Sequence, residues 1–211
     1  MHTNDLHKSA SDRKRSKIHW APWLLLFGFL AAGCLPVSLE PLYTESDLIL
    51  DKSLVGNWTS DQGKESWTFE ETEEEKVYLL RHIDNEKRGA AFAARLVVLG
   101  KHRFLDLYPA EIDAELNWLA GCQLIPGHVF FRLSISGDGM QLIPMSLEWL
   151  NEHIEKDPEA IRHKRIEEDG DDRILFTAST AELQKFVLKH ADDTAAFDPE
   201  SALELQRPDS E

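Results

Sequence analysis

Cysteine is scarce in this chain, which carries it only at positions 34 and 122 of 211 residues. Two thiols form at most one disulfide, so a disulfide framework and a multi-cysteine metal site are both excluded. Cys122 lies among apolar neighbours without basic residues close by in the sequence. We therefore expect it to be a small buried side chain rather than a reactive thiol.

Long hydrophobic runs are also lacking. The apolar stretch over residues 21–32 is about a dozen residues long, whereas a membrane-spanning helix needs about 20. Basic residues between Lys8 and Lys17 precede this stretch, and small residues separate it from Cys34, an order that is typical of an export signal. A short buried helix is the alternative interpretation.

Established catalytic signatures are absent from the sequence. It has no His-Glu-x-x-His, no Gly-x-Ser-x-Gly, no P-loop and no Gly-x-Gly-x-x-Gly. The histidines are scattered, and the acidic runs over 70–75 and 167–172 lack the alternating ligands of a calcium loop, so we expect no metal and no cofactor.

We therefore predict that the protein is not an enzyme. A composite hydrolase-like site remains the alternative, because four suitable residues lie on adjacent predicted strands. These residues are Asp106, Tyr108, His128 and Arg132.

Positive charge is in short supply, with 23 Lys and Arg against 38 Asp and Glu and a net charge of −15. Residues 1–33 hold 5 of the basic and 2 of the acidic residues, so the remainder holds 18 and 36, a net charge of −18. Such a surface repels nucleic acid and anionic lipid head groups. We expect no nucleic-acid partner.

The chain does contain a series of short β-prone runs separated by glycine-containing turns. Val129, Phe131 and Leu133 share one face of such a run, and Arg132 and Ser134 share the other. This alternation predicts an antiparallel sheet packed mainly on one side. The predicted strands cover residues 54–59, 65–70, 77–83, 91–99, 103–108, 128–136, 140–145, 161–167 and 173–177.

Two helices are expected to interrupt the strands. Leu147, Leu150 and Ile154 share one face of the first. A capping box over residues 179–182 precedes the second, which runs to His190.

About nine short strands must close or fold over, because an open sheet would leave long edges and a wet apolar face. The predicted fold class is mainly β with two or three helices (α+β), an antiparallel meander that forms a barrel or strongly curved half-barrel. A third, short helix is expected within 112–122. The predicted domain organisation is a signal peptide over 1–33, a tether over 34–50, a single β-rich globular domain over 51–192 and an acidic disordered tail over 193–211.

The residues that lead into Cys34, Leu30-Ala31-Ala32-Gly33, resemble the lipobox of bacterial lipoproteins, although Ala31 stands where that family prefers leucine. The resemblance implies cleavage between Gly33 and Cys34 and a lipid anchor on Cys34. Two or three acyl chains hold a protein almost permanently, since each buried methylene contributes about 0.8 kcal/mol. Leu35 rather than aspartate follows, which implies the outer membrane, facing the periplasm, if the source has two membranes. An ordinary secretory signal with a chance cysteine is the alternative.

The segment Leu54-Val55-Gly56-Asn57-Trp58 is similar to the Gly-x-Trp opening of lipocalin-like barrels, in which the tryptophan closes the barrel floor. Together with the leader and the segments 104–109, 147–150 and 180–190, it also looks like a group of uncharacterised bacterial lipoproteins. These resemblances imply a lipocalin-like barrel in the cell envelope.

The sequence thus predicts a membrane-anchored, non-catalytic binding module for a small apolar or amphipathic ligand. Aromatic side chains that face a barrel interior can line an apolar pocket, and they can equally be plain core. The expected lining residues are Trp58, Trp67, Phe92 and Phe131. The alternative is an envelope protein–protein interaction or assembly lipoprotein without a ligand pocket. In both cases the lipid on Cys34 makes the membrane a partner.

Overall fold

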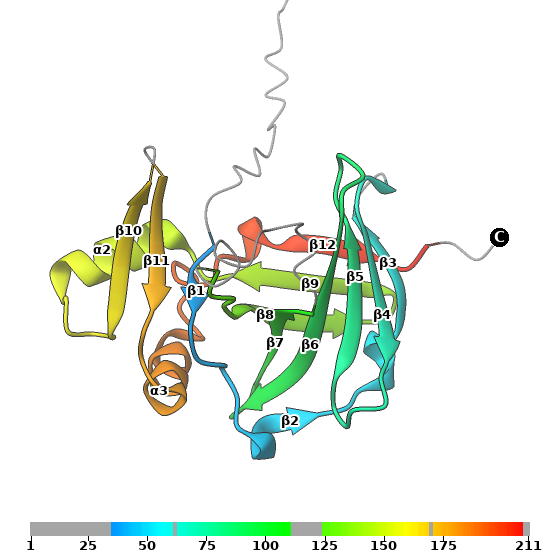
Figure 1. Cartoon of the computed structure of the whole chain (residues 1–211), viewed down its shortest axis with the longest axis horizontal. Helices are drawn as coiled ribbons and strands as arrows, with labels where there is room; N and C mark the ends of the chain where they lie inside the picture. The colour runs from blue at the N-terminus through cyan, green and yellow to red at the C-terminus, as the bar shows by residue number, and fades with distance from the viewer. Residues whose placement is uncertain (1–34, 61–62, 111–123, 169–170, 209–211) are drawn as a thin grey trace, which may run out of the picture. The chain divides into compact units, whose positions relative to one another are not determined.

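The structure is a computed structural model, which describes residues 35–60, 63–110, 124–168 and 171–208 (Figure 1). Short strands dominate it, and two α-helices and three short 3-10 helices accompany them among the described residues. In chain order, the elements are β1 (Val37–Ser38), η1 (Glu45–Asp47), β2 (Leu48–Ile49), η2 (Lys52–Leu54), β3 (Gly56–Ser60), β4 (Ser66–Glu71), β5 (Tyr78–Ile83), β6 (Gly89–Leu99), β7 (His102–Pro109), β8 (Val129–Ser136), β9 (Gly139–Pro144), α2 (Leu147–Lys156), β10 (His163–Glu168), β11 (Asp171–Phe176), α3 (Thr180–His190), η4 (Pro199–Ser201) and β12 (Leu203–Gln206).

Eight antiparallel strands close into a barrel. The sheet runs β2-β6-β5-β4-β3-β12-β9-β8-β7, and a further pairing between β6 and β7 joins its ends. Strand β6 is long enough to pair along one edge first with β5 and then with β2, while its other edge pairs with β7. The barrel and the α+β fold class predicted from the sequence are therefore confirmed.

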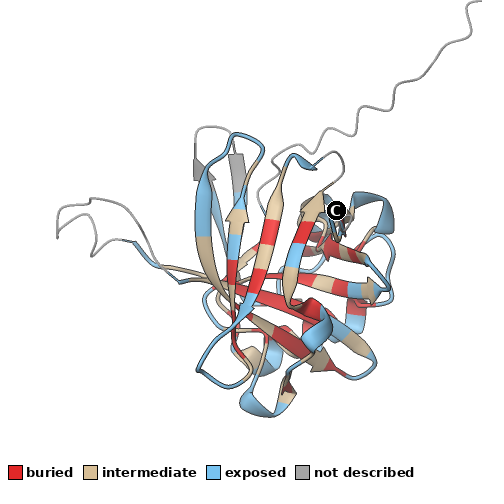
Figure 2. Cartoon of the chain, turned by 90° about the vertical axis from the view of Figure 1, so that its right-hand side faces the viewer, coloured by how far each residue is buried: buried red, intermediate tan, exposed pale blue. Residues whose placement is uncertain are grey.

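Buried residues alternate with more exposed ones along the barrel strands (Figure 2). Many of the buried ones form one apolar cluster inside the barrel. On β4, Trp67 and Phe69 are 7% and 1% exposed, and their partners across β5 include Leu80, which is fully buried. Burying a large apolar side chain contributes about 1.5–3 kcal/mol relative to its exposure, so this interior cluster is a main source of stability.

Contacts between β3, the segment that enters it and the residue after β12 close one end of the barrel. Trp58 on β3 is fully buried, and its indole N–H donates to the carbonyl oxygen of Leu54 over 2.8 Å. The guanidinium of Arg207 lies 4.3 Å from the centre of the Trp58 ring and donates to the carbonyl oxygens of Ser53 and Val55. We call this the closed end.

Gly56 is required at the closed end for two reasons. Its φ of +119° is one that other residues rarely adopt, and a Cβ there would lie 2.8 Å from a guanidinium nitrogen of Arg207. The Gly-x-Trp pattern therefore has a local physical basis in this chain, since glycine leaves room for the arginine that covers the tryptophan.

A second core lies outside the barrel. The hairpin β10–β11 pairs with β1 in a separate three-stranded sheet, which lies with α2 and α3 beside the barrel (Figure 1). Outward-facing side chains of the barrel, among them Phe104, Phe130 and Ile143, pack in one cluster with Leu150 of α2 and Phe186 of α3. Part of the barrel sheet is thus buried on both faces, whereas the sequence pattern predicted a sheet that packs mainly on one face.

The segment predicted as a tether, residues 34–50, is folded from Pro36 onward as far as it is described. Pro36, Ser38 and Leu42 are buried, and the segment contains β1, η1 and β2. The prediction is wrong here because the prolines and weak periodicity that suggested a linker belong to a strap over the outside of the barrel. We refer to residues 35–43 as the strap.

The prediction that residues 193–211 form a disordered acidic tail is also wrong for the part that the structure describes. Phe197 and Leu205 are fully buried, and β12 inserts between β3 and β9. This strand has only four residues, in which Leu alternates with polar side chains. It forms because both of its edges pair with neighbouring strands, β3 on one side and β9 on the other.

No helix among the described residues has the length and apolar character to cross a bilayer. The predicted signal peptide, the cleavage and lipidation site at Gly33 and Cys34, the helix expected within 112–122 and Cys122 all lie outside the described residues.

Candidate functional site

A cross-strand row of interior side chains leads from the closed end towards the opposite end of the barrel. Trp58, Trp67, His82 and Ala90 are successive register partners on β3, β4, β5 and β6. Trp58 is fully buried, Trp67 is 7% exposed, His82 is partly exposed and Ala90 is exposed. Solvent exposure therefore increases along this row from β3 to β6, and we call the end of the barrel at Ala90 the mouth.

Two buried nitrogen atoms at the mouth lack hydrogen-bond partners. They are Nε1 of Trp67 and Nε2 of His82. The two rings contact each other, with centroids 4.6 Å apart and planes tilted by 54°. A buried polar group without a partner costs about 1–3 kcal/mol. A bound molecule that formed a hydrogen bond with either nitrogen atom would recover part of that free energy.

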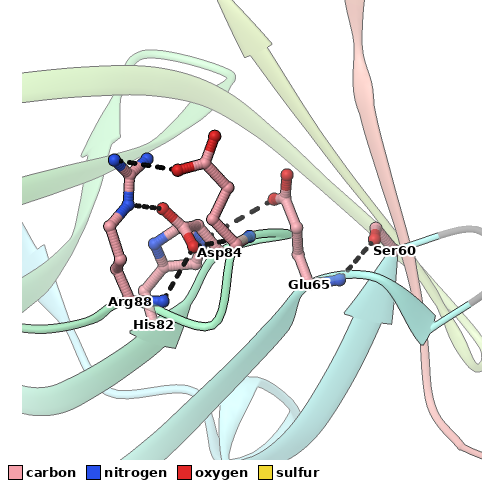
Figure 3. A network of polar contacts seen from close by, with 6 residues as sticks. Ser60, Glu65, His82, Asp84 and Arg88 are labelled. Atoms are coloured by element: carbon pink, nitrogen blue, oxygen red, sulfur yellow. Dashed lines mark hydrogen bonds and ion pairs between the residues drawn. The ribbon is translucent and has the colours of Figure 1, made fainter.

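Glu65 approaches the same place from the start of β4. Its Oε2 lies 3.5 Å from Nε2 of His82, which is an ion-pair distance if the imidazole is protonated but is not a hydrogen bond here. The backbone N–H of Glu65 donates to the Ser60 hydroxyl over 3.0 Å, which ties the residue before β4 to the end of β3 (Figure 3). Both the Glu65 and the His82 side chains are 22% exposed.

The β5–β6 turn extends the polar network outward (Figure 3). The Asp84 carboxylate accepts from the backbone N–H groups of Glu86 and Arg88 and from Nε of Arg88 over 2.8 Å. These bonds, those from Arg88 first, lower the pKa of Asp84. Arg88 also pairs with the Glu86 carboxylate at 3.1 Å, so this guanidinium already has two anionic partners.

Apolar side chains complete the mouth. Phe92, Val129 and Leu203 pack against the interior cluster yet remain partly exposed. Of the four predicted lining residues, Trp58, Trp67 and Phe131 belong to the interior cluster, and Phe92 packs on it. Trp67 and Phe92 lie at the mouth, whereas Trp58 lies under Arg207 at the closed end.

The composite site considered as an alternative is only partly assembled, on the outer wall of the barrel. His128 Nδ1 and Asp106 Oδ1 are 2.6 Å apart and buried, and the Tyr108 ring lies 4.7 Å from the imidazole. Arg132 is engaged elsewhere and donates to the carbonyl oxygens of Ala191 and Phe197.

The Asp106–His128 pair holds the strap. Asp106 Oδ2 accepts from the backbone N–H of Leu42 over 3.1 Å, and Ser38 exchanges two backbone hydrogen bonds with His128. The Ser38 hydroxyl donates to the carbonyl oxygen of Glu40, so it is not directed at the imidazole as a nucleophile would be. These contacts give the Asp106–His128 pair a structural role, which is to hold the strap against the barrel.

The described part of the chain holds an open hollow outside the barrel but no cluster of metal-binding side chains. There, no three His, Cys, Asp or Glu side chains converge so as to hold an ion. An open hollow of about 290 Å³ lies outside the barrel, against residues 158, 159, 161–163 and Thr177, and it includes none of the predicted lining residues.

Sequence reasoning missed the polar residues of the mouth. Glu65 and His82 extend the interior-facing alternation of Trp67 and Leu80 by one step each, which was a usable signal. Their convergence depends on barrel closure and was not visible locally. Comparison of the chain with protein-family models, with curated proteins and with solved structures finds no match.

Proposed function

We propose that the mature protein is a membrane-anchored binding module whose barrel mouth holds a small apolar or amphipathic ligand. One observation carries this proposal: Trp67 and His82 leave buried nitrogen atoms without partners beside apolar side chains that are still partly exposed. An apolar surface with a few convergent polar groups is the usual composition of a small-molecule site.

The filled lower half of the barrel limits the depth of such a site. Tyr78, Leu96 and Met140 are fully buried in the interior cluster. We therefore place the ligand's apolar part against Phe92, Val129 and Leu203 and its polar group at Trp67 and His82. The ligand would be bound near the surface of the protein rather than enclosed in the barrel interior.

The anchor is the lipid on Cys34, after cleavage between Gly33 and Cys34. The basic segment, short apolar run and lipobox-like residues before Cys34 support this proposal. We place the protein in the cell envelope, at the outer membrane facing the periplasm if the source has two membranes. The strap begins directly after the anchor, so the domain would be held close to the bilayer.

Native mass spectrometry of the protein extracted from membranes tests both parts. We expect a chain that starts at Cys34 and carries acyl chains, together with a non-covalently bound species. An unmodified full-length chain would refute the anchor, and a lipoprotein that neither co-purifies with nor binds any added amphiphile would refute the ligand site. Cys34→Ala should move the protein to the soluble fraction.

A second function, protein–protein interaction or assembly in the envelope, is favoured by one separate observation. Ile125 is 77% exposed and its neighbour Leu124 is 47% exposed, next to the strap-contacting residues Gly127 and His128. Exposed aliphatic side chains of this kind are common at protein contacts. Crosslinking from position 125 in intact cells should capture one specific partner if this function is correct, and none if it is not.

A further inference from the structure

We propose that the mouth selects amphiphiles whose head group is uncharged and both donates and accepts a hydrogen bond, a long-chain alcohol being the simplest, over carboxylates of the same chain length. This inference rests on the proposed function, because it specifies the head group for the same site.

The hydrogen-bonding capacity of the three polar groups sets the requirement. The indole N–H of Trp67 only donates, so it needs an acceptor. An ionised Glu65 carboxylate only accepts, and Nε2 of His82 does either, depending on the tautomer. A single hydroxyl group satisfies this set, since its oxygen accepts from Trp67 and its proton goes to Glu65 or His82.

Charge at the mouth disfavours an anionic head group. The partly exposed Glu65 carboxylate lies 3.5 Å from His82 Nε2 (Figure 3), and Asp84 and Glu86 lie on the adjacent turn. Arg88, the cation within this network, is already paired with both of the latter. A fatty-acid carboxylate would therefore bring a negative charge beside Glu65 without a free cation of the network to receive it.

Two lysines on the same turns do not supply a cation for an anionic head group inside the mouth. Lys64 and Lys87 are exposed, and neither lies in the interior-facing row of Trp67 and His82. A cationic head group is not the best match either. An alkylammonium only donates, so it would leave the Trp67 N–H unpaired while contacting Glu65.

Calorimetric titration with three amphiphiles of equal chain length, decanol, decanoate and decylammonium, tests the proposal. The protein is the full chain carrying Cys34→Ala, so that no covalent lipid competes for the mouth. We expect decanol to bind about tenfold more tightly than decanoate, a difference that corresponds to about 1.4 kcal/mol, with decylammonium between them.

Two variants locate the head group. Trp67→Phe replaces the indole with a smaller aromatic ring that has no N–H, and it should weaken decanol binding about five- to tenfold. Glu65→Gln removes the negative charge, and it should narrow the preference for decanol over decanoate. The matched controls are Trp149→Phe, in the core outside the barrel, and Glu204→Gln, on the exposed face of β12, and neither should alter binding.

The outcomes separate this inference from the proposed function. Decanoate binding as tightly as decanol, or unchanged decanol binding by a folded Trp67→Phe variant, would overturn the head-group preference while leaving the ligand site in place. Absence of binding by all three amphiphiles would overturn the proposed function as well. Circular dichroism of each variant establishes that it is folded.

Discussion

Arg207 shows how a single side chain outside any predicted element can complete the barrel. It covers the Trp58 ring at 4.3 Å and donates to two backbone carbonyl oxygens of the segment that enters β3. A cation over an aromatic face contributes about 0.5–2 kcal/mol, and hydrogen bonds from a charged group contribute further. Arg207 thereby holds the end of β12 against the start of β3.

We predict that Arg207→Ala lowers the free energy of unfolding by about 2–3 kcal/mol, because the stacking and the two hydrogen bonds disappear together. Urea denaturation measures this loss. Arg207→Lys should restore part of it, since lysine keeps the charge without the planar fork. Arg81→Ala removes an exposed arginine whose Nε lies 3.6 Å from Glu70, and it should change stability by less than about 0.5 kcal/mol. Equal losses for Arg207→Ala and Arg81→Ala would contradict the role of Arg207.

His190 makes the stability of the second core sensitive to pH. It is 9% exposed, and its ring centroid lies 4.7 Å from those of Trp149 and His153. Burial, then the nearby His153 and Lys189, lower the pKa of His190 below 6.5, while Asp193 opposes the shift. The unfolded chain thus binds a proton at a higher pH than the folded chain does.

We therefore predict that stability is complete above about pH 6.5 and falls as the pH decreases through the window between the unfolded and folded pKa values. His190→Phe should flatten this part of the profile, as measured by urea unfolding between about pH 7 and 5. The control is His163→Gln, at a partly exposed position whose ring hydrogen-bonds a backbone carbonyl. The assignment fails if His190→Phe keeps the wild-type slope.

At the scale of elements, the strap is attached to the barrel by few polar contacts that are well buried. Asp106 is fully buried and serves both His128 and the backbone N–H of Leu42, and Gln184 of α3 donates to the carbonyl oxygen of Leu42 over 3.0 Å. The strap is thus held between the barrel wall and α3, which joins the two cores.

Removing the Asp106 carboxylate should loosen the strap before it unfolds the barrel. We predict that Asp106→Ala costs about 2–4 kcal/mol, because it leaves the Leu42 N–H and His128 unpaired. Hydrogen exchange should accelerate most at the amides of Ser38 and Leu42. Asp106→Asn retains an acceptor and should cause a smaller effect. Unchanged protection of these two amides in the alanine variant would show that the carboxylate does not hold the strap.

At the scale of the whole molecule, the folded strap fixes how an anchored domain stands on a bilayer. One residue, Leu35, separates Cys34 from the buried Pro36, and the two Cα–Cα steps between them span at most about 7 Å. A lipid on Cys34 would therefore hold the barrel against the membrane surface, since no flexible tether intervenes within the described strap.

If the proposed anchor is present, we predict that limited proteolysis of the membrane fraction does not release the domain, because backbone hydrogen bonds of Ser38 and Leu39 hold the strap and only Leu39 and Glu40 are exposed between Pro36 and Leu42. Insertion of a glycine- and serine-rich linker after Leu35 should make release rapid. Release of the wild-type domain at the rate of the linker variant would contradict a folded strap on the membrane.

Local signals in the sequence determined the nine predicted strands and both predicted helices within the described residues. Turn glycines such as Gly100 and Gly137, both with φ of +59°, and the capping box of Ser179 and Glu182 act through neighbours in the chain. The alternation that buries Phe131 and Leu133 is likewise local, and it was enough to predict a barrel-like fold.

Only the tertiary structure decided which segments join which sheet. The β10–β11 hairpin lies outside the barrel, while β12, from the predicted tail, completes it. The pairings that place these strands link residues far apart in the chain, such as Leu205 with Ser60, and no local propensity encodes them. The same holds for the meeting of Glu65, Trp67 and His82, because two strands and the closure of the barrel bring these side chains to one mouth.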